Sequence, residues 1–219
     1  MSLSKVINTP TVPTDLAEEL GPEGVREILE IFWMSYHDMI KSEYKADEGK
    51  SEDKITEDWY AFIQQRWFRE NRATVIKLHL YPVTQHMDET MAKPRGQAPK
   101  IDFCFRTWAS DDRYFGAECK NLAEGNAYLS KRYIDTGVEH YVSGRYGSFS
   151  TENALIGYVL KGSLPGIVKT LGEKIKENND AEGLSRDITY IEPHYFSRHV
   201  RRIDGKEIKI DHLFFDFTD

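Results

Sequence analysis

Two neighbouring segments with alternating apolar and polar residues constrain the fold of this chain more than any other feature. In residues 101–108, Ile101, Phe103 and Phe105 alternate with Asp102, Cys104 and Arg106. In residues 114–122, Phe115, Ala117 and Cys119 alternate with Gly116, Glu118 and Lys120. A period of two gives each strand one apolar and one polar face. The intervening Ala-Ser-Asp-Asp sequence is typical of a turn, so we expect an antiparallel hairpin.

This hairpin is expected to place three charged side chains on one face, with Asp102 opposite Glu118 and Lys120. Two adjacent carboxylates repel each other and lose hydration as they are buried. Mg²⁺ prefers hard oxygen ligands and usually keeps several waters, so two protein carboxylates suit it. Lys120 is then placed to polarise a metal-bound water or to stabilise charge on an attacked phosphorus. The pattern predicts a metal site at Asp102 and Glu118, with Lys120 as a catalytic residue.

The arrangement of Asp102 followed by Glu118-Cys119-Lys120 on a short hairpin resembles the PD-(D/E)XK nuclease superfamily, which has the restriction-endonuclease-like fold. The similarity continues through residues 133–146 and 156–160, and looks like a branch found among bacterial restriction and defence nucleases. The resemblance implies a Mg²⁺-dependent endonuclease acting on DNA, with Mn²⁺ as a substitute metal. It also implies that the carbonyl of Cys119 is a metal ligand. The proline that usually precedes the first acid is absent, because Lys100-Ile101 precedes Asp102.

Three further residues are candidates for the site. Glu57 begins a predicted helix before the first strand, and in the resembling family a glutamate on such a helix often joins the catalytic metal site. Its alternative role is that of a first-turn acid favoured by the helix dipole. Arg132 and Arg145 follow the hairpin and are predicted to contact nucleic-acid phosphates, with a solvated helix face as the alternative. The basic stretch 197–202 is either an edge strand protected by charge or a DNA-contacting ribbon.

The remaining periodicities predict an α/β fold with a mixed central sheet flanked by helices on both faces. We expect one domain over residues 1–219, comprising an N-terminal arm and helix (1–55) and an α/β nuclease core (56–219). Thr56 is the predicted N-cap of the second helix. Helices are expected at 22–47, 56–71, 126–134, 138–143 and 163–178, and strands at 73–83, 101–108, 114–122, 154–161, 187–191, 194–202 and 207–217. The last two strands flank Asp204-Gly205, which predicts a C-terminal β-hairpin.

Composition limits the cellular setting and the partners. No apolar run reaches membrane-spanning length and no signal-peptide pattern is present, so we expect a cytoplasmic protein without a membrane partner. The two cysteines are expected on opposite faces of the hairpin, which argues against a disulfide. Of the net charge of −7, residues 15–58 contribute −9 (14 acids, five bases), and residues 59–219 contribute +1 (22 acids, 23 bases). The predicted core is therefore near neutral rather than strongly basic.

Two functions remain open at this point. The first is a metal-dependent endonuclease that hydrolyses phosphodiester bonds in DNA, with a role in restriction or phage defence. The second is a catalytically inactive or partner-dependent module that binds nucleic acid or protein through the same fold, with the acidic N-terminal part as a docking surface. A homodimer or a partner subunit of a defence system is compatible with both. The residues do not distinguish DNA from RNA or define a recognition sequence, and metal binding separates the two functions.

Overall fold

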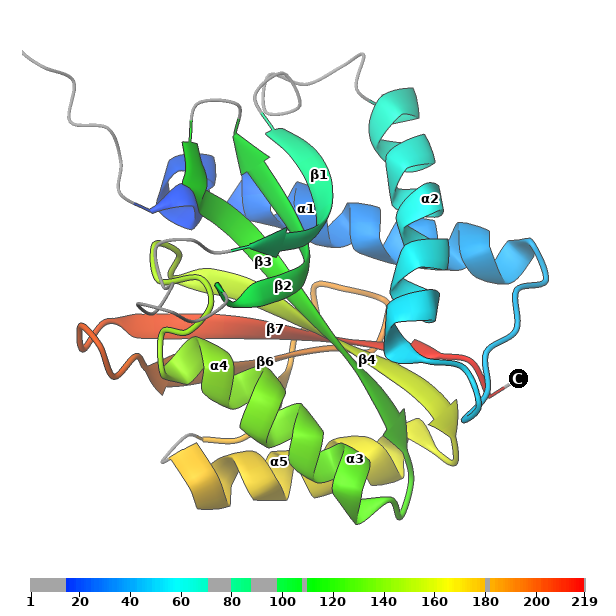
Figure 1. Cartoon of the computed structure of the whole chain (residues 1–219). Helices are drawn as coiled ribbons and strands as arrows, with labels where there is room; N and C mark the ends of the chain where they lie inside the picture. Colours follow the sequence, from blue (N-terminus) through cyan, green and yellow to red (C-terminus); the bar gives the residue numbers. More distant parts are fainter. Residues whose placement is uncertain (1–14, 71–79, 88–97, 108–109, 180–181, 219) are drawn as a thin grey trace, which may run out of the picture.

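The computed structural model describes residues 15–70, 80–87, 98–107, 110–179 and 182–218. These residues form a seven-stranded sheet in the order β1-β2-β3-β4-β7-β6-β5 (Figure 1). Its strands are β1 Leu80–Met87, β2 Lys100–Thr107, β3 Ser110–Ala123, β4 Glu152–Lys161, β5 Ser185–Arg186, β6 His194–Val200 and β7 Glu207–Asp216. The β3–β4 and β4–β7 pairs are parallel, and the other pairs are antiparallel. The predicted mixed sheet is therefore present.

Helices cover both faces of this sheet, as predicted (Figure 1). On one side lie α1 Leu16–Lys41 and α2 Glu52–Glu70. On the other side lie α3 Ala127–Arg132, the π-helical segment η3 Tyr133–Val138, α4 Glu139–Val142 and α5 Leu164–Asn179. Among the described residues, no helix combines the length and apolar character needed to cross a bilayer.

Two clusters of buried apolar side chains hold these layers together. The cluster under α1 and α2 is rich in aromatic rings: Trp59 lies 5.2 Å from Phe32 and 5.0 Å from Phe215, measured between ring centroids. The opposite cluster joins the sheet to η3, α4 and α5 through residues such as Tyr133 and Leu171. Because β4 lies between both clusters, its residues 153–160 are all buried, which explains their nearly continuous apolar sequence.

The first helix, α1, consists of two helical stretches on either side of Gly21. The side chain of Asp15 accepts hydrogen bonds from the backbone N–H groups of Ala17 and Glu18, and so caps α1 at Leu16. Gly21, with a positive φ of 65°, interrupts the helical path, so the helix predicted from residue 22 does start there, with Pro22 in its first turn. It ends at Lys41, rather than at residue 47.

The second helix begins at Glu52 instead of residue 56. Ser51 lies at its start, where its hydroxyl accepts a hydrogen bond from the backbone N–H of Lys54 at 3.3 Å. Thr56 is therefore not the N-cap: it lies inside α2, and its hydroxyl donates to the carbonyl of Glu52 at 2.9 Å. The shift matters because it places Glu52 and Asp53, rather than Glu57, in the first turn.

Three other predictions about secondary structure are also corrected. The two short helices predicted at 126–134 and 138–143 form one continuous helical path, because Asp135-Thr136-Gly137 lies within η3 rather than in a break. Residues 187–191 form turns instead of a strand, and β5 spans only Ser185–Arg186. In the segment predicted as strand 73–83, β1 begins at Leu80 and continues to Met87, while residues 73–79 lie outside the described residues.

Candidate active site

The hairpin of β2 and β3 brings the predicted charged triplet together. The two strands are antiparallel, and Phe103 pairs with Ala117. Beyond that pair, the ammonium of Lys120 lies 2.6 Å from Oε1 of Glu118 and 4.0 Å from Oδ2 of Asp102. Cys119 points the other way and packs into the cluster under α1 and α2. The alternation of residues along β3 therefore turns the triplet toward one face of the sheet, as predicted.

Lys120 is the centre of the site. Its side chain is only 4% exposed, and the ammonium donates to three acceptors: Glu118 Oε1 at 2.6 Å, the Cys119 carbonyl at 2.7 Å and Glu52 Oε1 at 3.3 Å. A lysine ammonium has three N–H donors. All three are thus engaged within the protein, and none is left for another ligand in this arrangement.

Asp102 joins the two strands as well as contributing charge. Its Oδ2 accepts a hydrogen bond from the backbone N–H of Cys119 at 2.8 Å. The side chain of Asp102 thereby continues the contact between β2 and β3 past their last paired residues. An acid at this position consequently fixes the backbone between Glu118 and Lys120.

Burial and neighbouring charges shift the pKa values of all three members of the triplet. Burial raises the pKa of Glu118 to about 8, with a further contribution from the negative charge of Asp102. Burial also raises the pKa of Asp102, although Lys120 and the N–H of Cys119 oppose the change. Burial alone would lower the pKa of Lys120, but Glu118, Glu52 and Asp102 together raise it above its ordinary value. The lysine is therefore a fixed positive charge, and Glu118 is the group that titrates near neutral pH.

Glu52 is a member of this cluster that the sequence analysis missed. From the first turn of α2, its Oε2 accepts from the backbone N–H of Asn121 at 3.0 Å, and its Oε1 contacts Lys120. Glu57, the helix acid that we predicted at the site, is exposed, and none of the interactions described here joins it to the triplet. The sequence did contain a signal for Glu52: Ser51 followed by two acids, Glu52 and Asp53, is a typical helix start.

Buried hydrogen bonds hold the first turn of α2 against β3. The hydroxyl of Tyr158 on β4 lies 3.2 Å from the sulfur of Cys119 and 3.0 Å from the hydroxyl of Thr56. Next to this contact, the side-chain amide of Asn121 donates to the carbonyl of Lys50 at 3.1 Å. These contacts fix the backbone on both sides of Glu52 relative to the triplet.

The two predicted nucleic-acid contacts differ in their placement. Arg132, at the end of α3, reaches the cluster: its Nη2 lies 3.5 Å from Oε1 of Glu52, and its side chain is 39% exposed. Arg145 is exposed in the turn after α4, and none of the hydrogen bonds or ion pairs described here connects it to the carboxylates. Only Arg132 is therefore joined directly to the candidate active site.

The chemistry of the cluster suits a hard divalent cation, although no complete metal cage is present. Within the described residues, no three His, Cys, Asp or Glu side chains are arranged to hold a metal ion. The expected ligands are instead two carboxylates and the Cys119 carbonyl, a small oxygen set of the kind that Mg²⁺ completes with water. Oε2 of Glu118 is buried and has no hydrogen-bond partner, so one ligand atom is already desolvated and unpaired. Two other predicted ligand atoms, Oε1 of Glu118 and the carbonyl oxygen of Cys119, accept hydrogen bonds from the ammonium of Lys120.

The basic stretch 197–202 is used inside the fold. Arg201 is buried, donating to the carbonyls of Gly147 and Ser150 at 2.8 Å each and forming an ion pair with Asp204 at 2.7 Å. Arg198 and Arg202 form exposed ion pairs with Glu207 and Glu139, respectively. Each of the three arginines thus has an acidic partner within the protein. The strand β6 itself lies between β7 and the two-residue strand β5 rather than at the edge of the sheet.

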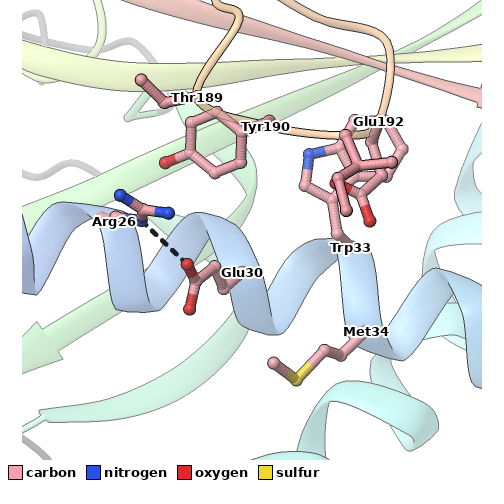
Figure 2. A pocket seen from close by; sticks show the side chains of 8 residues that line it. Arg26, Glu30, Trp33, Met34, Thr189, Tyr190 and Glu192 are labelled. Carbon is pink, nitrogen blue, oxygen red and sulfur yellow. Dashed lines mark hydrogen bonds and ion pairs between the residues drawn. The ribbon is translucent and has the colours of Figure 1, made fainter.

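A separate pocket of about 300 Å³ lies between α1 and the segment that joins β5 to β6 (Figure 2). It is lined by Arg26, Glu30, Trp33, Met34, Thr189, Tyr190, Ile191 and Glu192. Arg26 and Glu30, two of its charged residues, pair with each other at 2.9 Å. The pocket contains none of the predicted site residues, so the candidate active site remains the cluster around Lys120.

The structure brings Asp102, Glu118 and Lys120 together and adds Glu52 to them. Arg132 contacts this cluster through Glu52, whereas Glu57 and Arg145 are exposed and are not joined to it by the interactions described here. No family model, curated protein or solved structure matches this chain.

Proposed function

We propose that this protein is a Mg²⁺-dependent nuclease that hydrolyses phosphodiester bonds in DNA. The observation that carries the proposal is the buried ammonium of Lys120, which lies within 4.0 Å of the carboxylates of Glu118, Glu52 and Asp102. Such a cluster is costly to bury, because each charge loses hydration and the carboxylates repel one another. Perturbed ionisable groups of this kind are concentrated at functional sites.

Each residue has a distinct role in the proposed reaction. Asp102 and Glu118, together with the carbonyl of Cys119, would hold the metal. When bound there, Mg²⁺ would supply a water of lowered pKa and offset charge on the phosphate. Lys120 keeps its positive charge and, once one of its three acceptors leaves, would donate to anionic oxygen as charge develops on the scissile phosphate. The hydrogen bond from Cys119 fixes the carboxylate of Asp102 in its orientation.

The resemblance to restriction and defence nucleases supports DNA as the substrate and restriction or phage defence as the setting. Cleavage of both DNA strands requires two catalytic events, which a homodimer or a partner subunit would provide. Arg132 is the basic residue that we propose to contact a phosphate beside the site; its partial exposure and its existing contact with a carboxylate oxygen support this role.

A binding module without catalysis is the second candidate, and one observation favours it. All three N–H donors of Lys120 are engaged within the protein, as expected of an ion cluster that only stabilises the fold. The acidic N-terminal part would then serve as a docking surface for a partner. Metal binding separates the candidates, because a purely structural cluster has no reason to bind Mn²⁺.

The decisive experiment compares nicking of supercoiled plasmid by the wild type, Lys120→Met and Lys54→Met at about 5 to 10 mM Mg²⁺, an excess for a weak carboxylate site. Lys54 is the matched control, since it is an exposed lysine on the first turn of α2 and pairs with Asp58. We expect nicking by the wild type and Lys54→Met only. Equal nicking by all three proteins would contradict the assignment of Lys120.

A calorimetric titration with Mn²⁺ accompanies the cleavage assay. Because Lys120 occupies two of the proposed ligand atoms, Lys120→Met is expected to bind Mn²⁺ at least as tightly as the wild type, while failing to cleave. No heat from either protein, together with no nicking, would favour the binding module.

A further inference from the structure

Three hydrogen-bond donors converge on the carboxylate of Glu52. Oε1 lies 3.3 Å from the ammonium of Lys120 and 3.5 Å from Nη2 of Arg132, and Oε2 accepts from the backbone N–H of Asn121 at 3.0 Å. These donors belong to β3 and α3, whereas Glu52 belongs to α2. Two of the donors are cations and the third is a backbone amide.

This donor set is one that proteins use to bind phosphate. Arginine, lysine and backbone N–H groups are among the groups that contact phosphate oxygens in nucleic-acid complexes. A carboxylate resembles a phosphate in presenting two adjacent anionic oxygens, and charge-assisted hydrogen bonds to either group are strong. Glu52 therefore occupies a position whose surroundings are equally suited to a substrate phosphate.

The lengths of the three hydrogen bonds of Lys120 indicate which acceptor a phosphate would replace most easily. The ammonium has no spare N–H donor, so it can meet a phosphate only if one acceptor leaves. Its contacts with Glu118 and the Cys119 carbonyl measure 2.6 and 2.7 Å, whereas its contact with Glu52 measures 3.3 Å. Glu52 makes the longest of the three contacts and is the acceptor most readily displaced.

We propose that Lys120, the backbone amide of Asn121 and Arg132 form a phosphate subsite, and that the carboxylate of Glu52 covers this subsite in the free protein. A phosphodiester of the substrate takes the place of the carboxylate. The proposal rests on the proposed nuclease function and defines how that site admits its substrate.

The displacement needs only a rotation of the Glu52 side chain. The helix backbone at this position is fixed, because the carbonyl of Glu52 accepts from the hydroxyl of Thr56 at 2.9 Å and the carbonyl of Lys50 accepts from Asn121 at 3.1 Å. Arg132, with a side chain 39% exposed, marks the side on which the subsite meets solvent. A phosphate thus has access at Arg132 while α2 stays in place.

The test measures DNA binding without catalysis, by fluorescence anisotropy of a labelled duplex in EDTA. The variants are Glu52→Ala and, as the matched control, Glu57→Ala, which removes the same charge from an exposed position on the same helix. We expect Glu52→Ala to bind at least about tenfold more tightly than the wild type, because a like charge is removed from the phosphate position. Glu57→Ala should bind within about twofold of the wild type, and Glu52→Ala with Arg132→Gln should lose the gain.

The variant Glu52→Gln and the ligand inorganic phosphate allow the phosphate subsite to be tested separately from the nuclease function. Glu52→Gln preserves side-chain size, so it replaces Glu52→Ala if the latter melts well below the wild type. Inorganic phosphate, titrated in a thermal-shift assay, tests the subsite independently of DNA. A phosphate-dependent rise in melting temperature that is larger for Glu52→Ala than for the wild type and Glu57→Ala supports the subsite, even if no protein binds DNA and the nuclease proposal fails. Equal responses of Glu52→Ala and Glu57→Ala to phosphate would overturn the subsite, whatever the proteins do with DNA.

Discussion

The carboxylate of Asp102 accepts a hydrogen bond from the backbone N–H of Cys119, 17 residues further along the chain, at 2.8 Å. The N–H belongs to the residue between Glu118 and Lys120, so this contact sets the geometry of the whole triplet. Asp102 accordingly combines two roles that mutagenesis must separate: a structural acceptor for β3 and a charged candidate ligand for a metal.

Asparagine and alanine at position 102 are expected to have different effects on stability and the same effect on activity. Asp102→Asn keeps an oxygen acceptor for the Cys119 N–H and removes a carboxylate whose pKa is raised by burial, so its stability should stay within about 1 kcal/mol of the wild type. Asp102→Ala leaves the N–H unpaired and should cost about 1–3 kcal/mol. Both should lose metal-dependent cleavage. Urea unfolding and plasmid nicking, measured on both variants, check this; an Asp102→Asn protein that still cleaves would exclude Asp102 as a metal ligand.

Metal affinity is expected to rise with pH because of Glu118. Its pKa is about 8 in the metal-free protein, so a proton occupies the carboxyl group over most of the range below pH 8. A metal must displace that proton, which weakens apparent binding by up to about tenfold for each pH unit below the pKa. Calorimetry with Mn²⁺ should therefore show affinity about tenfold or more higher at pH 8.5 than at pH 6.5. In Glu118→Gln, which cannot ionise, the dependence should disappear together with most of the binding; pH-independent affinity in the wild type would contradict the role of Glu118.

The charged triplet could be predicted from the sequence because it depends on period-two alternation, and the central strand could be predicted because its sequence is almost continuously apolar. Phe103 and Ala117 pair as the hairpin required, and the run 154–160 reads as a strand covered on both faces because β4 is such a strand. These features depend on local pattern and on the turn between two adjacent strands. Contacts with residues distant in the sequence leave the predicted strands and the triplet in place.

The parts that the sequence did not predict depend on helix boundaries and on distant contacts. Thr56 looked like an N-cap, but Ser51 begins the helix, and this shift exchanges Glu57 for Glu52 at the site. Glu52 meets Asn121 across 69 positions of the chain, a contact that no local periodicity encodes. Arg201 looked like part of an exposed basic strand, yet the loop 147–150 supplies the carbonyls that make it a buried residue.

Two arginines three positions apart on the C-terminal hairpin are expected to differ sharply in their contribution to stability. Arg201 is 1% exposed, and its removal takes one donor from each of the carbonyls of Gly147 and Ser150 and breaks the ion pair with Asp204. We expect Arg201→Gln to lower the free energy of unfolding by about 3 kcal/mol. Arg198 forms an exposed pair with Glu207, so Arg198→Gln should change it by less than about 1 kcal/mol. Urea unfolding of both variants measures the difference, and equal losses would show that the buried network contributes no more than the exposed pair.

The pH dependence of stability is expected to reflect a buried network on β6 and β7. The hydroxyl of Ser197 lies 2.7 Å from Nε2 of His199 and 2.8 Å from Nε2 of His212. Burial lowers the pKa of His199 to about 4, and burial together with the neighbouring His199 lowers that of His212 to about 3. Both imidazoles are therefore neutral in the folded protein at pH 5, whereas an unfolded histidine, with a pKa near 6.5, is protonated there.

The sign of the effect follows from where the protons bind. Between about pH 6.5 and pH 4 the unfolded chain binds a proton at position 199 that the folded protein excludes, so stability falls as pH falls, by up to about 1.4 kcal/mol per pH unit. His199→Leu removes this contribution while His212 keeps its contact with Ser197. The loss in free energy of unfolding between pH 7.5 and pH 5 should thus be smaller in His199→Leu than in the wild type, by about 1–2 kcal/mol. His37→Leu, at a histidine with a side chain 46% exposed, is the control and should leave the loss unchanged within about 0.5 kcal/mol. Urea unfolding at the two pH values measures all three proteins, and a loss as large in His199→Leu as in the wild type would show that His199 does not exclude a proton from the folded state.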